Sequence, residues 1–145
     1  METIKIVGKK VSMTQLPSRA GKFIPTTAIK ISQESSVLDF QEGEEIKVSG
    51  ISKGKGFAGV IKKYHFSRGR MTHGGGYPHR LIGSMGGGRG TNQGIPKGKK
   101  MPGRMGGKKV TQKSEIIKID KEKQIIFLRG GIPGPRKGEI ILKKL

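Results

Sequence analysis

Between Ile46 and Ser114 the sequence contains no aspartate or glutamate, although this stretch carries 16 of the chain's 30 lysine and arginine residues. A protein surface normally mixes both signs, because like charges repel each other and destabilise the compact state. A stretch of one sign therefore favours an external polyanion, and nucleic acid is the most abundant one in a cell. The alternative from charge alone is a disordered basic linker.

Cysteine is also absent, which excludes disulfides and thiolate metal sites and is compatible with a reducing compartment. No apolar run approaches the roughly 18 residues that span a bilayer, so we expect no membrane partner. Residues Met1–Thr3 include an acid where a signal or transit peptide carries basic residues. We therefore expect a cytoplasmic location.

The positive charge is concentrated in the middle of the chain, and so is the glycine. Residues 1–45 hold six cations and six anions, and residues 115–145 hold eight cations and four anions, whereas the stretch between them holds 18 of the 25 glycines. This pattern predicts one small body with a basic extension. A body of that size buries only about 60% of its unfolded surface, so we expect a partner to complete its stability.

Alternation of apolar and polar residues predicts about six short strands in the flanks. The candidate strands are Ile4–Val7 (ended by Gly8), Phe23–Ile31, Ile46–Val48, Val110–Ile119, Gln124–Leu128 and Glu139–Lys143, with Val37–Phe40 as a further short candidate. Ile29 and Ile31 are expected on one face of their strand, and Ile117 and Ile119 on one face of theirs. The fold class is therefore mainly β, as a small antiparallel barrel or sandwich.

The middle stretch has one candidate helix. Phe57, Val60 or Ile61, and Tyr64 recur at helical spacing. Beyond it, Ser67 to Gly107 is predicted to be irregular, and irregular segments of this length are usually functional or disordered. Glycine in such a segment lets backbone amides approach phosphates closely.

Enzyme motifs find little support. Gly54–Gly59 matches the GxGxxG string of dinucleotide-binding folds, but the acidic residue expected about 20 positions later is missing, since the next acid is Glu115. His65, His73 and His79 have no neighbouring cysteine or carboxylate, which argues against a closed zinc site. We expect no catalytic residue, cofactor, metal or small-molecule substrate.

Aromatic residues support nucleic-acid binding. Phe57, Tyr64, Phe66 and Tyr77 lie among the cations, where they could stack on unpaired bases. Phe57 and Phe66 are more readily explained as anchors for the base of the extension. No base-reading helix is visible, so RNA recognised by shape fits better than sequence-specific DNA.

Several strings resemble the bacterial form of the large-subunit ribosomal protein L3 family, over about residues 1–15 and 37–145. The most specific are GISKGKGFAGV at Gly50–Val60 and KGKKMPGRMG at Lys97–Gly106. Shorter matches are Val7–Lys10, Met13–Gln15, Thr72–Gly74, His79–Arg80, Gly83–Ser84 and Gly130–Gly134.

The resemblance implies a six-stranded Greek-key β-barrel (residues 1–52 and 109–145) with a basic extension (residues 53–108) that penetrates large-subunit rRNA. It further implies a structural role in the large subunit, early assembly, support of RNA near the peptidyl transferase centre, neighbouring large-subunit ribosomal proteins as partners and no homo-oligomer. The rRNA-binding residues carried over are Lys53, Lys55, Lys62, Lys63, Arg68, Arg70, His73, His79, Arg80, Arg89, Lys97, Lys99, Lys100, Arg104, Lys108 and Lys109.

Three departures from the family pattern stand out. The segment before Ile46 is shorter than in family members, Ser12 replaces a usual glycine, and the tip does not align cleanly. The tip is expected at Gly88, Arg89, Gly90, Thr91, Asn92 and Gln93, with Gln93 as a possible methylation site. Two other classes stay open, namely a non-ribosomal basic RNA chaperone or histone-like protein, and a nucleotide-using enzyme.

Overall fold

The computed structural model describes residues 5–18, 21–32, 40–76, 79–86 and 94–145. The chain divides into two compact units, one of Met1–Lys53 with Gly107–Leu145 and the other of Gly54–Gly106. The first unit contains β1 (Lys5–Pro17), β2 (Phe23–Ile31), β3 (Glu45–Ile51), β6 (Lys109–Asp120), β7 (Ile125–Arg129) and β8 (Glu139–Lys144). The second contains β4 (Phe57–Ala58), α1 (Val60–Tyr64) and β5 (Gly103–Arg104).

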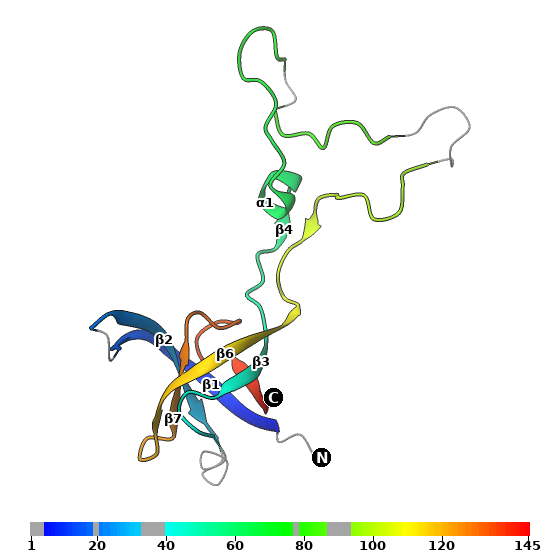
Figure 1. Ribbon diagram of the computed structural model, residues 1–145. Helices are drawn as coiled ribbons and strands as arrows, with labels where there is room; N and C mark the ends of the chain where they lie inside the picture. Colours follow the sequence, from blue (N-terminus) through cyan, green and yellow to red (C-terminus); the bar gives the residue numbers. More distant parts are fainter. Residues whose placement is uncertain (1–4, 19–20, 33–39, 77–78, 87–93) are drawn as a thin grey trace. The chain divides into compact units, whose positions relative to one another are not determined.

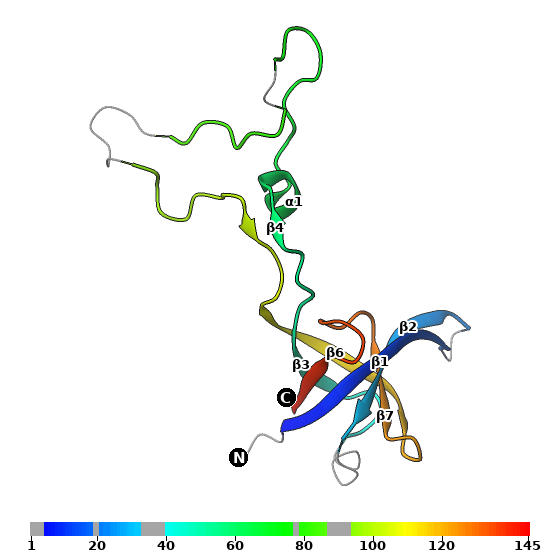
Figure 2. The same ribbon diagram turned by 180° about the vertical axis from the view of Figure 1, so that it is seen from behind.

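The six strands of the first unit form a closed antiparallel barrel in the order β1-β2-β7-β6-β3-β8 (Figures 1 and 2). Within it, β3, β6 and β7 follow one another in space, and β8 returns to lie beside β3. That arrangement is a Greek key, in which a fourth strand returns beside the first of three consecutive strands. The mainly β, six-stranded barrel predicted from the sequence is confirmed.

The barrel interior is filled by hydrophobic side chains from all six strands and from the loops that connect them, and all of them except Phe40 are aliphatic. The cluster contains Ile6, Ile29, Ile31, Phe40, Ile46, Val48, Ile116, Ile126, Leu128, Ile132, Ile140 and Leu142, with Ile119 packed against it. The prediction that Ile29 and Ile31 share a face is confirmed, since both are fully buried. Every member of this core belongs to the first unit, so the barrel has its own hydrophobic centre.

The first strand continues where the sequence predicted that it would end. Gly8 lies inside β1, and a Cβ atom at this position would lie 2.6 Å from Cγ2 of Ile29 on the neighbouring β2. The glycine therefore lets two strands approach closely, which is the other common use of glycine in a strand. Of the predicted strand at Val37–Phe40, residues 37–39 lie outside the described residues, and Phe40 lies in the core without being part of a strand.

The prediction that Ile117 and Ile119 lie on one face of β6 was also wrong. The pairing of β6 with β7 shifts register between Ile116 and Lys118, so a bulge interrupts the alternation. Ile116 is therefore fully buried in the core together with the partly buried Ile119, whereas Ile117 is outside the cluster. A strict two-residue period had placed Ile117 with Ile119.

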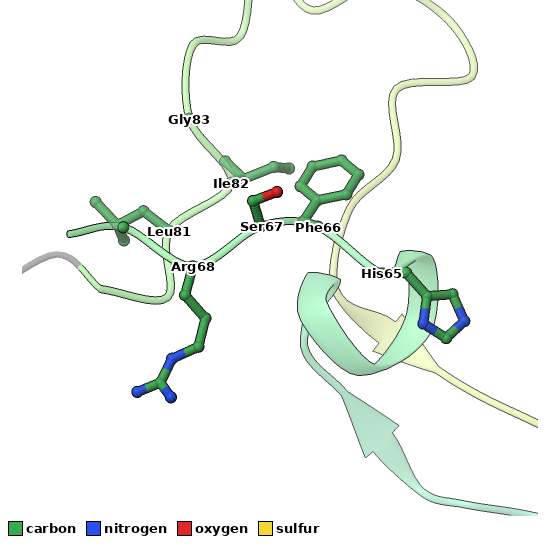
Figure 3. Close-up of a pocket in the computed structure, with 8 residues that line it drawn as sticks. His65, Phe66, Ser67, Arg68, Leu81, Ile82 and Gly83 are labelled. Atoms are coloured by element: carbon green, nitrogen blue, oxygen red, sulfur yellow. The ribbon is translucent and has the colours of Figure 1, made fainter. Parts of the chain in front are cut away.

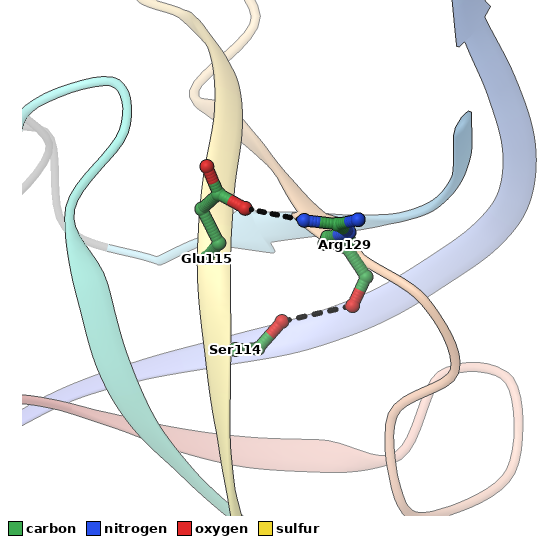
Figure 4. Close-up of polar contacts among 3 residues, drawn as sticks. All are labelled: Ser114, Glu115 and Arg129. Carbon is green, nitrogen blue, oxygen red and sulfur yellow. Dashed lines mark hydrogen bonds and ion pairs between the residues drawn. The ribbon is translucent and has the colours of Figure 1, made fainter. Parts of the chain in front are cut away.

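Polar contacts hold the same two strands together near Ser114. Its hydroxyl donates to the backbone oxygen of Arg129 at 2.9 Å, and the guanidinium of Arg129 pairs with Glu115 at 3.0 Å (Figure 4). The ion pair is largely exposed and contributes little to stability. In the described part of the chain, no helix has the length and apolar character needed to cross a membrane.

Candidate nucleic-acid interface

The second unit begins and ends as a short two-stranded ribbon. β4 pairs with β5 through Phe57 opposite Arg104 and Ala58 opposite Gly103. The ribbon extends by one further pair of contacts, in which the amide of Lys55 donates to Met105 and the amide of Met105 donates to Gly56. These bonds bring the two ends of the unit side by side, so the residues between them form one closed excursion of the chain.

Helix α1 follows this ribbon and confirms the predicted helix, although Phe57 lies in β4 instead. Val60 is its buried residue, and His65 ends it in the left-handed conformation, with its amide donating to the oxygen of Ile61. The last turn carries Lys62 and Lys63, where cations interact favourably with the free carbonyl groups of a helix end.

Phe57 does not serve as a buried anchor, because its side chain is 76% exposed. Phe66 is half-buried, and its ring centroid lies 6.3 Å from that of Tyr64. Tyr64 in turn lies under two ammonium groups, with the Nζ atom of Lys63 5.1 Å and that of Lys100 5.8 Å from its ring centroid. Tyr64 and Phe66 therefore lie next to each other, with two cations over the ring of Tyr64, which is the composition of a stacking platform for bases.

A cavity of about 640 Å³ opens beside Phe66. It is lined by His65, Phe66, Ser67, Arg68, Gly69, Leu81, Ile82 and Gly83. Figure 3 shows the ring of Phe66 and the side chain of Ile82 on the same side of the backbone, with the guanidinium of Arg68 directed away from them. The volume is in the range of ligand pockets, and an aromatic ring beside aliphatic side chains suits an unstacked base.

The chain around this cavity is held mainly by its own backbone. The amide of Gly69 donates to the oxygen of His79 at 2.9 Å, and Nδ1 of His79 lies 2.9 Å from the oxygen of Arg70. Gly75 lies so close to Arg70 that a Cβ would come within 2.5 Å of its backbone oxygen. Farther along, the ammonium of Lys99 donates to the oxygen of Ser84 at 2.8 Å.

The cations of the second unit have no carboxylate in their own segment, because the sequence has none between residues 46 and 114. Within the part of the chain that the structure describes, the ion pairs are Arg129–Glu115 and Lys144–Glu44, and both belong to the barrel unit. Among the described residues, no cation of the second unit is therefore paired with a carboxylate.

The structure places most of the predicted rRNA-binding residues at the surface. Those with exposed side chains are Lys53, Lys55, Lys62, Arg68, Arg70, His73, Arg80, Lys97, Lys100, Arg104, Lys108 and Lys109. Lys63, His79 and Lys99 are half-buried. Lys53, Lys108 and Lys109 belong to the barrel unit and the others to the second unit. Arg89 and the rest of the predicted tip, Gly88, Gly90, Thr91, Asn92 and Gln93 with its possible methylation, lie outside the described residues.

Sequence reasoning missed two groups of residues. Leu81 and Ile82 join Phe66 at the large cavity, and the signal was available, since they are an apolar pair in an otherwise basic and glycine-rich segment. Lys10 and Arg136 meet Lys53 at a second, smaller cavity in the barrel unit. No signal in the sequence could have joined residues so far apart. Across the described ranges, no three His, Asp or Glu side chains gather as metal ligands do.

Comparison with known proteins finds matches that include residues of both units. The family model "Ribosomal protein L3" matches residues 15–125. The large ribosomal subunit protein uL3 of Geobacillus thermodenitrificans is 50% identical over 115 residues, which are 79% of this chain and 53% of the relative. The protein of the same name from Macrococcus caseolyticus is 48% identical over 116 residues, 79% of this chain and 52% of the relative.

A third relative extends the match. The uL3 protein of Exiguobacterium sibiricum is 45% identical over 139 residues, 94% of this chain and 65% of the relative. The chain thus spans about half the length of the first two relatives and about two thirds of this one. With a family model that matches well over half of its residues, and with the barrel and basic segment described above, the chain belongs to the ribosomal protein L3 family.

Proposed function

We propose that this chain is a structural, non-enzymatic component of the large ribosomal subunit that binds large-subunit rRNA through its basic extension. The observation that carries the proposal is the acid-free segment, whose exposed cations lack carboxylate partners within that segment. Such a segment gains most from a surrounding polyanion, because phosphates remove the repulsion between its like charges. The names of the relatives, each a large ribosomal subunit protein, support the same assignment.

The finer parts of the proposal follow from family membership. The barrel would lie at the subunit surface, beside neighbouring ribosomal proteins in the cytoplasmic ribosome, while the extension enters the rRNA near the peptidyl transferase centre. Exposed Lys55, Arg68, Arg70 and Arg104 would contact phosphates, and the cavity beside Phe66 would hold an unpaired base. By fixing RNA helices in this way, the extension would assist early subunit assembly.

Salt dependence of RNA binding tests the proposal. If six to ten cations contact phosphates, affinity for a large-subunit rRNA fragment should fall roughly 10³–10⁵-fold between 50 and 200 mM salt. The measurement is a fluorescence binding titration of the full chain at several salt concentrations. A flat salt response would contradict phosphate contacts.

A competitor RNA separates the ribosomal role from that of an indiscriminate RNA chaperone. An unrelated structured RNA of equal length should bind much more weakly than the rRNA fragment at 200 mM salt, because only the cognate fold matches the shape of the extension. Equal affinity for both RNAs would favour the chaperone. Saturable binding of a free nucleotide, measured by calorimetry on RNA-free protein, would instead favour an enzyme.

A further inference from the structure

The barrel unit has a cationic cavity of its own, separate from the large cavity of the second unit. It has a volume of about 180 Å³. Its lining consists of Lys10, Ser12, Met13, Lys53, Gly134 and Arg136. Three of these six residues are cations and none is an acid, although the barrel unit as a whole contains all ten of the chain's acids. The cavity thus gathers three of the 19 lysine and arginine residues of the barrel unit without any of its acids.

At this cavity, Lys10 is hydrogen-bonded to the loop between β7 and β8. Its backbone amide donates to Gly138 at 3.0 Å, and its backbone oxygen accepts from Lys137 at 2.7 Å. Its ammonium donates to the oxygens of Ile132 at 2.6 Å and Gly134 at 3.3 Å. An ammonium has three N–H donors, so one remains for a ligand. A donor fixed in advance loses little entropy when it binds.

The environment of Lys10 at the cavity disfavours its charged form. Burial, and secondarily the nearby charge of Lys53, lower the pKa of Lys10 from its usual range. Neither Lys53 nor Arg136 takes part in the ion pairs of the described residues. Anchoring of the loop explains the hydrogen bonds of Lys10, but it does not explain why two further cations converge there.

The size of the cavity restricts the ligand. Pockets for drug-sized ligands and cofactors usually measure about 300–1,000 Å³. At roughly 30 Å³ per water, 180 Å³ equals the space of about six waters, which is enough for one tetrahedral oxyanion but small for a nucleoside. Arginine and lysine together are the residues that bind phosphate oxygens, the former through its planar fork and the latter as a point charge.

We infer that the cavity lined by Lys10, Lys53 and Arg136 binds a single phosphate of the RNA backbone. The inference rests on the proposed function, and it adds a contact made by the barrel itself, with two cations that sequence reasoning had not assigned. One phosphate is shared by three side chains. The barrel is thereby attached to RNA at the point from which the extension departs, since Lys53 directly precedes the second unit.

The test uses full-length protein and the slope of log affinity against log salt for the rRNA fragment. Each phosphate contact contributes about 0.7–0.9 to the magnitude of this slope. The double variant Lys53→Gln with Arg136→Gln should reduce the magnitude by about one contact's worth, because both residues share one phosphate. The matched control is Lys118→Gln with Lys121→Gln, which removes equal charge at the other end of β6, and its slope should stay as in the wild type. Thermal unfolding followed by circular dichroism verifies that each variant is folded.

Inorganic phosphate gives a readout that does not depend on RNA. In ¹H–¹⁵N NMR spectra, phosphate should shift the amide signals of Ser12, Gly134 and Arg136 saturably. Arg136→Gln should abolish these shifts, whereas Arg136→Lys should retain part of them.

Three results of the salt experiment would each overturn the inference: an unchanged slope in the double variant, a reduction by two contacts, or an equal loss in the control. Shifts with inorganic phosphate but no change in slope would assign the cavity to free phosphate and would also overturn it. If the wild type fails to bind the rRNA fragment, the proposed function fails, whereas the phosphate titration still reports on the cavity.

Discussion

At the scale of single residues, the second unit differs from an ordinary protein surface in what its cations contact. The ammonium of Lys99 is held by the backbone oxygen of Ser84, and that of Lys63 lies over the ring of Tyr64. Such neighbours orient a cation but leave its full charge in place. The side chains are therefore positioned and still able to attract phosphate.

Which of these residues matter could be predicted only in part. A count of charges was enough to name cations such as Lys55 and Arg68, since a long acid-free run indicates a polyanion partner from composition alone. It could not show that Phe66, Leu81 and Ile82 meet at one cavity, because that depends on how an irregular segment folds back on itself. Aromatic residues in such segments have no periodicity from which their neighbours could be read.

Replacing Phe66 with alanine tests the stacking role. RNA affinity should fall by about 1–3 kcal/mol, roughly fivefold to 150-fold, because one base loses its aromatic partner. The dependence of affinity on salt should stay unchanged, since no charge is removed. Both quantities come from the binding titration described above.

Phe23→Ala is the matched control for Phe66→Ala. Phe23 is an exposed aromatic on β2 of the barrel, outside the acid-free segment. Its replacement should leave RNA affinity within experimental error. Equal losses in the two variants, or none in Phe66→Ala, would argue against a base at the cavity.

At the scale of elements, local irregularities decided where the sequence-based prediction succeeded. β2 was predicted with its observed bounds, Phe23–Ile31, and its pairing with β7 contains no shift in register. β1 and β6 each contain a shift in register, between Lys10 and Ser12 and between Ile116 and Lys118. A bulge inserts one extra residue into a strand and has no fixed signature in the sequence. A prediction that assumes strict alternation therefore assigns every residue beyond the bulge to the wrong face of the sheet.

Alanine substitutions on either side of the bulge in β6 test its position. Ile116→Ala should lower the free energy of unfolding by about 2–5 kcal/mol, since it empties part of a fully buried site. Ile117→Ala should cost clearly less, because that side chain is outside the core cluster. Urea unfolding followed by circular dichroism measures both. A larger loss of stability in Ile117→Ala than in Ile116→Ala would contradict the position of the bulge and would support the strict alternation that places Ile117 with Ile119.

At the scale of the whole molecule, the hydrophobic core and the acid-free basic segment belong to different units. The barrel holds the entire core cluster and all ten acids, whereas the second unit holds 11 lysine and arginine residues and no acid. This division could be predicted from the composition of the chain. The flanks have the alternating apolar residues that a sheet needs to form a core, whereas the middle is basic and rich in glycine and has few side chains to bury. The boundary between the units depends on bonds such as that from Ser52 to Lys108, which no composition shift reveals.

Replacing residues 54–106 with an Asn-Gly turn tests whether the barrel supplies the stability and the second unit the RNA binding. The barrel should still fold cooperatively, because every member of its core remains and because Ser52 and Lys108 are already hydrogen-bonded across the gap. RNA affinity should fall steeply and its salt slope should shrink, since 11 of the 30 lysine and arginine residues are removed and with them 13 of the 16 predicted rRNA-binding residues. The measurements are urea unfolding and the same binding titration. An unfolded product, or one that still binds RNA as the wild type does, would contradict the assignment of stability to one unit and recognition to the other.

The pairing of β3 with β6 also has a consequence for the order of events during folding. These two strands are neighbours in the barrel, yet the whole second unit lies between them in the chain. Joining them therefore requires a long loop to close, which costs configurational entropy that a short hairpin does not incur. We therefore expect the β1–β2 and β6–β7 hairpins, which close short loops, to form first, and the pairing of β3 with β6 to be the slower step. An RNA that draws the two ends of the loop together would act as a template for that step and would speed the maturation of the barrel.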